Sequence, residues 1–157
     1  MKSHIPAIIN RIISLLDKYT DNKSLQLKYE NITSTPYEIA VPVTMQRSDR
    51  SKSFHLVMLD EERSQSRIAI VDRKSDSYSM NDFYHDVHND FQDYLPRFYP
   101  KLVSSSDKMI HYRINKGLFH SDLVYSRKEI DGHFFFIKFI GFRQKEVMPI
   151  LDSLRRE

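Results

Sequence analysis

The sequence contains no cysteine and no tryptophan, and only three of its 157 residues are glycine. Without cysteine there are no disulfides and no thiolate chemistry, which is typical of a reducing compartment and predicts a cytoplasmic location. Three scattered glycines cannot build a P-loop or a dinucleotide-binding fingerprint, and no G-x-S-x-G motif is present. We therefore expect a protein that is not an enzyme and has no catalytic residues, no cofactor and no metal.

Long hydrophobic runs are also missing. No apolar stretch approaches the roughly 18 to 20 residues that span a bilayer, so we expect no membrane span. Apolar residues recur at helical spacing over residues 5–19, which predicts an amphipathic helix. We expect this helix to pack on the sheet of its own domain, with a membrane surface or a partner's groove as alternatives. The apolar content of 40% is enough for one packed domain over residues 1–157.

The strongest local signal lies in residues 123–142. Asp131-Gly132 stands between two runs of strand-forming residues, which predicts a two-residue hairpin with a type I′ turn. This turn would place Ile130 opposite His133 and Lys128 opposite Phe135. Because side chains alternate along a strand, the second run would carry aromatic residues on both faces. We therefore expect it to be a central, covered strand.

The rest of the chain divides into strands and helices of ordinary length. Residues 37–45, 54–59 and 67–71 predict a three-stranded meander, in which Pro42 marks an edge strand. Ser79 is expected to cap a helix over 80–95. The segment 104–108 reads as a flexible connection, and further elements are expected over 108–115 (strand) and 147–154 (helix). The prediction is an α+β fold: an antiparallel sheet of about six strands in two three-strand segments, with three helices in the order α-βββ-α-βββ-α.

This predicted order of elements resembles that of the small type III secretion chaperones, which bind effectors through a sheet and helices. The resemblance is one of element order, without a shared motif. It implies a protein that binds another protein.

The distribution of charge points the same way. The net charge is +3 and the pI about 9.0, yet residues 76–95 contain five aspartates and no lysine or arginine. An acidic helix on a basic body is typical of an oriented binding surface. We predict a non-enzymatic binding module with a protein partner of unknown identity, either an immunity or inhibitor protein or a secretion-chaperone-like protein. A homodimer, in which the partner is a second copy of the chain, is an alternative. The predicted partner-binding residues are Asp82, Asp86, Asn89, Asp90 and Asp93.

The alternative is a nucleic-acid-binding accessory protein. Its phosphate contacts would come from a basic loop and the sheet rim, namely Arg47, Arg50, Lys52, Arg73 and Lys74. Bases would stack on exposed aromatic residues, for which Tyr112, Phe134 and Phe136 are the candidates. A metal site is a further alternative, because His85 and His88 are three residues apart on the predicted acidic helix. We interpret both histidines as part of a solvated helix face.

Overall fold

The computed structural model describes residues 8–9, 12, 25–48, 53–60, 66–73, 77–94, 99–116 and 119–157. Of the helix predicted over 5–19, Ile8, Ile9 and Ile12 are described, and they are helical and exposed. The rest of that prediction lies outside the described residues.

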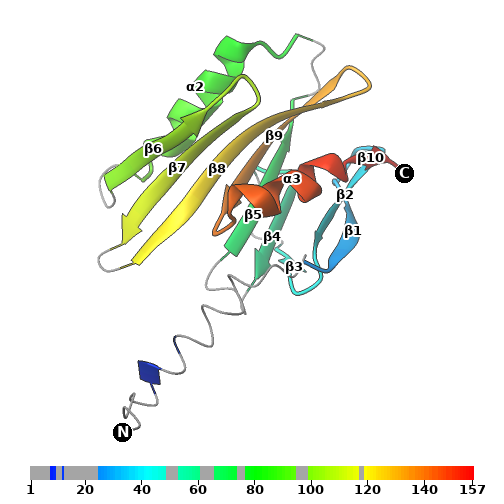
Figure 1. The fold of residues 1–157 in the computed structure, drawn as a ribbon. Coiled ribbons are helices and arrows are strands. Elements are labelled where there is room, and N and C mark those ends of the chain that lie inside the picture. The colour runs from blue at the N-terminus through cyan, green and yellow to red at the C-terminus, as the bar shows by residue number, and fades with distance from the viewer. Residues whose placement is uncertain are drawn as a thin grey trace, which may run out of the picture.

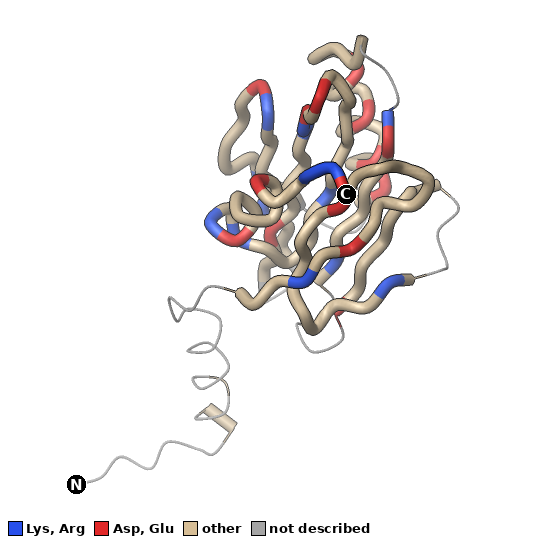
Figure 2. Tube along the Cα trace, turned by 90° about the vertical axis from the view of Figure 1, so that its right-hand side faces the viewer, with Lys and Arg blue, Asp and Glu red and all other residues tan. Residues whose placement is uncertain are grey.

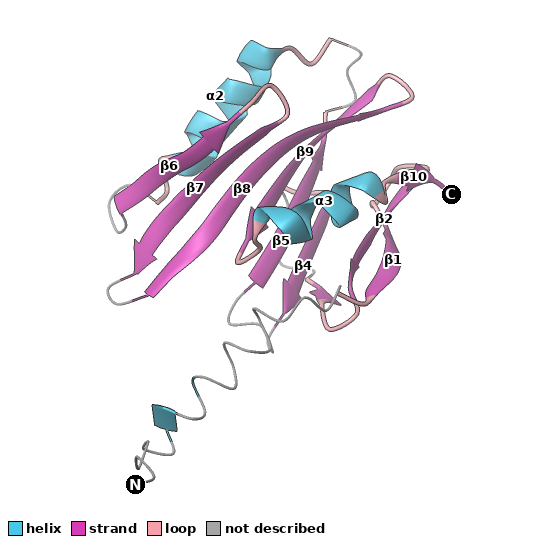
Figure 3. Cartoon of the chain, viewed as in Figure 1, coloured by secondary structure: helices cyan, strands magenta, loops and turns pink. Residues whose placement is uncertain are grey.

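The described strands form two antiparallel sheets (Figures 1 and 3). The smaller sheet has the order β1-β2-β10, with β1 (Leu27–Asn31), β2 (Tyr37–Pro42) and β10 (Arg155–Arg156). The larger sheet has seven strands in the order β3-β4-β5-β9-β8-β7-β6. Its strands in chain order are β3 (Gln46–Arg47), β4 (Leu56–Asp60), β5 (Ser66–Asp72), β6 (Tyr99–Ser105), β7 (Met109–Lys116), β8 (Phe119–Ile130) and β9 (His133–Ile140).

The predicted hairpin is confirmed as β8 and β9. Ile130 pairs with His133 and Lys128 with Phe135. The turn residues Asp131 and Gly132 have φ values of 51° and 76°, as a type I′ turn requires. β9 lies between β5 and β8, and residues 134–139 are all buried. The expected central, covered strand is therefore present.

The core has two halves, one on each face of the larger sheet. On one face, Phe135 and Ile137 pack with residues of β2 and of helix α3 (Gln144–Asp152). On the other, Phe134 and Phe136 pack with Phe83 and with further residues of helix α2 (Met80–Phe91). The sheet is thus covered by α2 on one side and by α3 with the smaller sheet on the other (Figure 1).

The predicted order of elements is wrong. The described chain has ten strands in sheets of three and seven, with two longer helices, instead of about six strands and three helices. β2 joins β1 and β10 and does not continue into a meander with β4 and β5. The connection expected over 104–108 contains the end of β6, which pairs with β7. The observed order removes the basis of the resemblance to the secretion chaperones.

Two of these errors have a clear physical cause. β10 has only two residues and pairs with Glu38 and Tyr37 across almost the whole chain, so no local pattern predicts it. The second error is the expectation that Pro42 marks an edge strand, since β2 is the middle strand of the smaller sheet. Glu38, near the start of β2, pairs with both β1 and β10, whereas Pro42 at its other end pairs only with Leu27 of β1. The proline without an N–H donor therefore lies where β2 has a single neighbour among the described strands.

Candidate functional site

Helix α2 begins with the capping arrangement that the sequence predicts. The backbone N–H of Asp82 donates to Ser79 Oγ at 3.1 Å, and the N–H of Ser79 donates to Asp82 Oδ2 at 2.9 Å. The hydrogen bond from the Ser79 N–H lowers the pKa of Asp82. Asp82 is exposed, but its carboxylate already stabilises the helix start.

Asp86, one turn later, points toward the end of β5. Its Oδ1 lies 2.5 Å from Nη2 of Arg73, and its Oδ2 accepts a short hydrogen bond from the hydroxyl of Tyr78. Burial, followed by this bond to Asp86, raises the pKa of Tyr78. Arg127 completes the anchor by donating from Nη2 to the Tyr78 carbonyl at 2.7 Å. The first half of α2 is thus fixed to β5 and β8.

Asp90 anchors the second half of the helix. Lys138 of β9 lies 2.8 Å from Oδ2 of Asp90, and the hydroxyl of Tyr125 donates to the same oxygen at 2.5 Å. Both partners are deeply buried, with the Lys138 side chain only 7% exposed. Burial and the nearby Asp90 raise the pKa of Tyr125. The Lys138 ammonium also lies 4.8 Å from the centre of the Tyr94 ring.

The five predicted partner-binding residues therefore have different roles. Asp82, Asp86 and Asp90 follow one another at four-residue spacing, and the last two are turned toward the sheet by Arg73 and Lys138. Asp86 is not the exposed carboxylate that a contact with a partner would need, because its side chain is only 14% exposed. Asn89 and Asp93 are exposed. We call the exposed surface of the helix and of the two residues that follow it the outer face of α2. Its residues are Tyr84, His85, His88, Asn89, Gln92 and Asp93.

The outer face contains Asp93 and uncharged side chains, with no lysine or arginine. The tube of Figure 2 shows aspartates and no lysine or arginine along the whole of α2. Tyr84 is 44% exposed and is the large hydrophobic residue of this surface. His88 Nε2 lies 2.9 Å from the amide nitrogen of Gln92, so His88 accepts this hydrogen bond. Among the described residues no group of three or more metal-ligating side chains occurs, which leaves His85 and His88 without the partners that a metal site needs.

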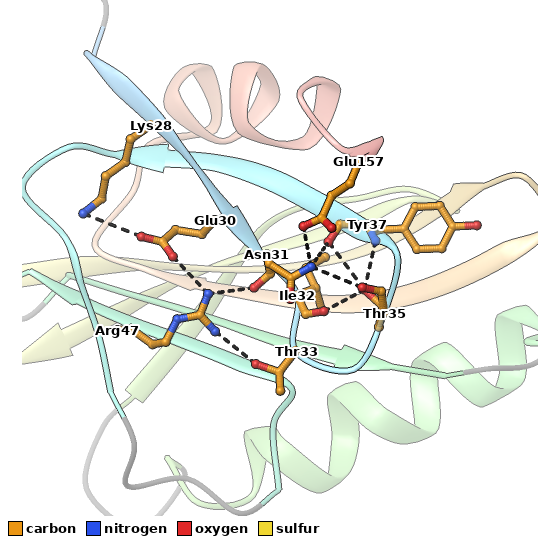
Figure 4. A network of polar contacts seen from close by, with 9 residues as sticks. All are labelled: Lys28, Glu30, Asn31, Ile32, Thr33, Thr35, Tyr37, Arg47 and Glu157. Atoms are coloured by element: carbon orange, nitrogen blue, oxygen red, sulfur yellow. Dashed lines mark hydrogen bonds and ion pairs between the residues drawn. The ribbon is translucent and has the colours of Figure 1, made fainter.

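The two described residues of the predicted basic surface, Arg47 and Arg73, are engaged in contacts within the protein. Arg47 donates to Glu30 Oε2 at 2.9 Å, to the Asn31 carbonyl at 2.8 Å and to Thr33 Oγ1 at 3.0 Å (Figure 4). This network joins β3 of the larger sheet to β1 of the smaller one. Arg73 is held by Asp86, as described above. Arg50, Lys52 and Lys74 lie outside the described residues.

The aromatic platform proposed for base stacking is not available on the surface. Phe134 is 7% and Phe136 is 3% exposed, and both lie beneath α2. Tyr112 stacks on Phe91 of the same helix, with ring centres 4.4 Å apart. Base stacking requires free ring faces, so these three residues cannot supply it in this fold.

Two histidine–aspartate pairs were not predicted. Nε2 of His111 lies 2.8 Å from Asp122 Oδ1, and Nε2 of His133 makes a short contact with Asp72 Oδ1. The strand register places His111 on β7 diagonally across from Asp122 on β8. Three of these four side chains are less than a fifth exposed, and each pair joins two neighbouring strands. We interpret both pairs as structural contacts between strands.

Comparison with known proteins finds a structure with a similar fold but gives no information on function. No protein-family model and no curated protein matches the chain. A crystal structure from Bacteroides thetaiotaomicron VPI-5482 is similar with a TM-score of 0.50 at 11% identity, covering 85% of this chain and 49% of that one. The chain thus spans about half the length of that structure. The structure of LpqN, involved in cell envelope biogenesis of Mycobacterium tuberculosis, aligns over 88% of this chain and 90% of its own at 10% identity, with a TM-score of only 0.39. At these identities the first similarity concerns the fold alone, and the second is too weak to support an argument.

No described helix is both long and apolar enough to cross a membrane.

Proposed function

We propose that this protein is a non-enzymatic protein-binding module that contacts its partner with the outer face of α2. The observation that carries the proposal is that one set of α2 residues binds the sheet and a different set is exposed. Asp86 and Asp90 are bound to Arg73 and Lys138, which fixes the helix on the sheet. The outer face stays free of these contacts and is presented by a rigid support.

A rigid support favours binding because little conformational entropy is lost when a partner docks. The capping box at Ser79 holds the first turn, and Lys138 with Tyr125 holds the last. The backbone of α2 is therefore already in the form that a partner would meet. This preorganisation is what an inhibitor, an immunity protein or a chaperone-like partner protein requires.

The chemistry of the outer face defines the surface that fits it. Tyr84 offers a large, partly exposed ring of the kind that is enriched at interface centres. Asn89 and Gln92 offer hydrogen bonds, and Asp93 adds negative charge without a basic residue nearby on the helix. A partner with an apolar pocket flanked by lysine or arginine would be complementary, and its charge would speed association. A cytoplasmic location, as proposed from the absence of cysteine, fits this role.

The described residues give no support to the nucleic-acid alternative, of which Arg50, Lys52 and Lys74 lie outside the part of the chain that the structure describes. Arg47 and Arg73 neutralise carboxylates within the protein, and the candidate stacking residues are packed beneath α2. We do not propose it further.

The proposal is tested by a tagged pull-down from the native host, followed by binding measurements with the partner so identified. Replacing Tyr84 by Ala together with Asp93 by Lys should weaken the purified complex by at least about tenfold, because a buried anchor and a favourable charge are lost. Met148→Ala on α3 is the matched control, since Met148 is 43% exposed and lies on a different helix.

The melting temperature of both variants should stay close to that of the parent protein, because all three side chains are exposed. A partner whose affinity is the same for the α2 variant and the parent would exclude this face. Recovery of nucleic acid without a protein partner would exclude the proposed function as a whole.

A further inference from the structure

β6 forms one margin of the seven-stranded sheet and, among the described strands, pairs only with β7 (Figures 1 and 3). In an antiparallel pair the backbone groups of successive residues point alternately toward the partner strand and away from it. The N–H of Ser106 donates to the Met109 carbonyl at 2.8 Å, so the N–H and C=O of the preceding Ser105 point away from β7. Such an edge is a template for one more strand.

The side chains of this edge are exposed on both faces of the sheet. Lys101 lies opposite Arg113 of β7, and the next residue, Leu102, lies opposite Tyr112. Because opposed residues share a face, Leu102 lies on the side of α2, against which Tyr112 packs, and Lys101 lies on the other side. Leu102 is 54% exposed and Val103 is 47% exposed, although both are large apolar residues.

The charge along this edge is positive. Lys101 is exposed and makes no ion pair with any described residue. Arg113 is 47% exposed, and its Nε lies 3.9 Å from Asp122 Oδ1. β6 itself contains no carboxylate. An aspartate or glutamate on a strand added beside β6 would therefore meet Lys101 first and Arg113 one strand further in, and both cations can donate to it.

We propose that β6 binds an extended acidic segment of a partner protein as an additional strand of the seven-stranded sheet. The segment carries a carboxylate on the face of Lys101 and Arg113 and an apolar side chain on the face of Leu102. Main-chain hydrogen bonds supply affinity, and the side chains on the two faces supply specificity. This surface is separate from the outer face of α2, so the inference goes beyond the proposed function and each can fail without the other.

A second copy of the chain fits this edge less well. Its β6 would add another lysine and no carboxylate, so like charges would approach each other. The register shift between Leu102 and Ser104 would also occur twice, once in each copy. Pro100, which has no N–H, and this irregularity both discourage pairing with a long, flat strand. They leave room for a short segment, which is the occupant that we propose.

The experiment is a titration of the isotope-labelled full-length protein with a capped peptide of alternating valine and glutamate, followed by amide chemical shifts. We expect the shifts to centre on residues 101–105 and the affinity to fall with added salt. The same peptide with glutamine in place of glutamate should bind about fivefold more weakly, because an exposed ion pair is lost. A peptide N-methylated at every residue should not bind, because it cannot donate main-chain hydrogen bonds.

Charge reversal in the protein tests the assigned contact. Lys101→Glu should weaken binding of the valine–glutamate peptide about tenfold, because repulsion replaces an attraction. The same variant should bind a valine–lysine peptide better than the parent does, which a misfolded variant would not do. Lys145→Glu on α3 is the matched control, since it changes an exposed lysine and the net charge in the same way. It should leave peptide binding unchanged.

The proposal is overturned if β6 shows no shifts, if the glutamate and glutamine peptides bind equally, or if the N-methylated peptide binds like the parent peptide. Self-association that protects the β6 amides without peptide would assign this edge to a second copy of the chain instead. Shifts confined to the outer face of α2 would also overturn it and would leave the proposed function standing. Tyr84→Ala with Asp93→Lys should bind the peptide like the parent protein, because neither residue belongs to the β6 edge.

Discussion

Replacing Lys138 by methionine should destabilise the protein by about 3 kcal/mol. Lys138 lies in the central strand β9, and its ammonium is 2.8 Å from Asp90 with only 7% of the side chain exposed. Methionine keeps the apolar stem that packs near Tyr94 but removes the charge. The Asp90 carboxylate is then left without its cation beneath α2, with only the Tyr125 hydroxyl to stabilise it.

The size of the effect follows from the burial of the two partners. Removing one member of a buried pair costs about 3 to 5 kcal/mol, because the remaining charge is poorly solvated. The Asp90 side chain is 17% exposed, so water relieves part of this cost and the lower end of the range applies. For a chain of this length the loss corresponds to a melting temperature about 6 to 12 °C lower.

A second substitution separates the charge from the packing. Lys138→Met with Asp90→Asn leaves no unpaired charge and keeps an oxygen that accepts the hydrogen bond from Tyr125. We expect this double variant to recover most of the loss, leaving about 1 kcal/mol. The free energies come from urea unfolding followed by circular dichroism, with an unchanged m-value as the sign that the unfolded state is the same.

The control for removing a lysine as such is Lys145→Met on α3, where the side chain is exposed. It should change the free energy of unfolding by less than about 0.5 kcal/mol. The reasoning is refuted if Lys138→Met is as mild as this control. It is equally refuted if the double variant is as unstable as the two single losses added together, because the charges would then act independently.

Two further predictions concern stability. The pKa values of Tyr78 and Tyr125 are raised in the fold by burial and by their aspartate partners, so both hydroxyls stay protonated at a pH where the unfolded chain ionises. Above pH ~10 stability should therefore fall by about 1.4 kcal/mol per pH unit for each tyrosine, and urea midpoints at rising pH should fall less steeply in the Tyr→Phe variants. Gly141→Ala should cost about 2 to 3 kcal/mol in urea unfolding, because Gly141 has a φ of 78° and a Cβ there would lie 2.7 Å from Ser66 Oγ. Gly132→Ala should cost only about 1 kcal/mol, since Gly132 has a φ of 76° but open space around it; equal losses would contradict this reading.

The sequence predicts those parts of the fold whose signals are local. Asp131-Gly132 and the alternation on either side specify the β8–β9 hairpin and its register, and Ser79 with Asp82 specifies the start of α2. The last two residues of β6 fall in the connection predicted over 104–108, because the serines there carry no strand pattern. Its pairing is decided by the neighbouring β7, and it includes a register shift between Leu102 and Ser104. Such pairings depend on the tertiary structure, so a short segment of sequence does not predict them.

The acidic helix shows the same limit at the level of the site. Helical periodicity places Phe83 and Val87 on the buried side of α2, and both are buried. Periodicity cannot predict whether Asp86 and Asp90, which border that side, face water, because their cations are Arg73, which directly follows β5, and Lys138 of β9. One signal was present: Lys138 interrupts a run of buried apolar residues, and a buried ammonium requires a carboxylate partner.

This division of the aspartates changes how the proposed function has to be tested. Replacing Asp86, Asp90 and Asp93 together by asparagine would remove the partners of Arg73 and Lys138, so any loss of binding would mix misfolding with a lost contact. Asp93 and Tyr84 are exposed on the outer face, and neither takes part in these ion pairs. If the negative charge of α2 served only to anchor the helix, substitutions at Asp93 would leave every interaction of the protein unchanged. A partner that distinguishes Asp93→Lys from the parent would show that the same helix uses its inner carboxylates for stability and its outer face for recognition.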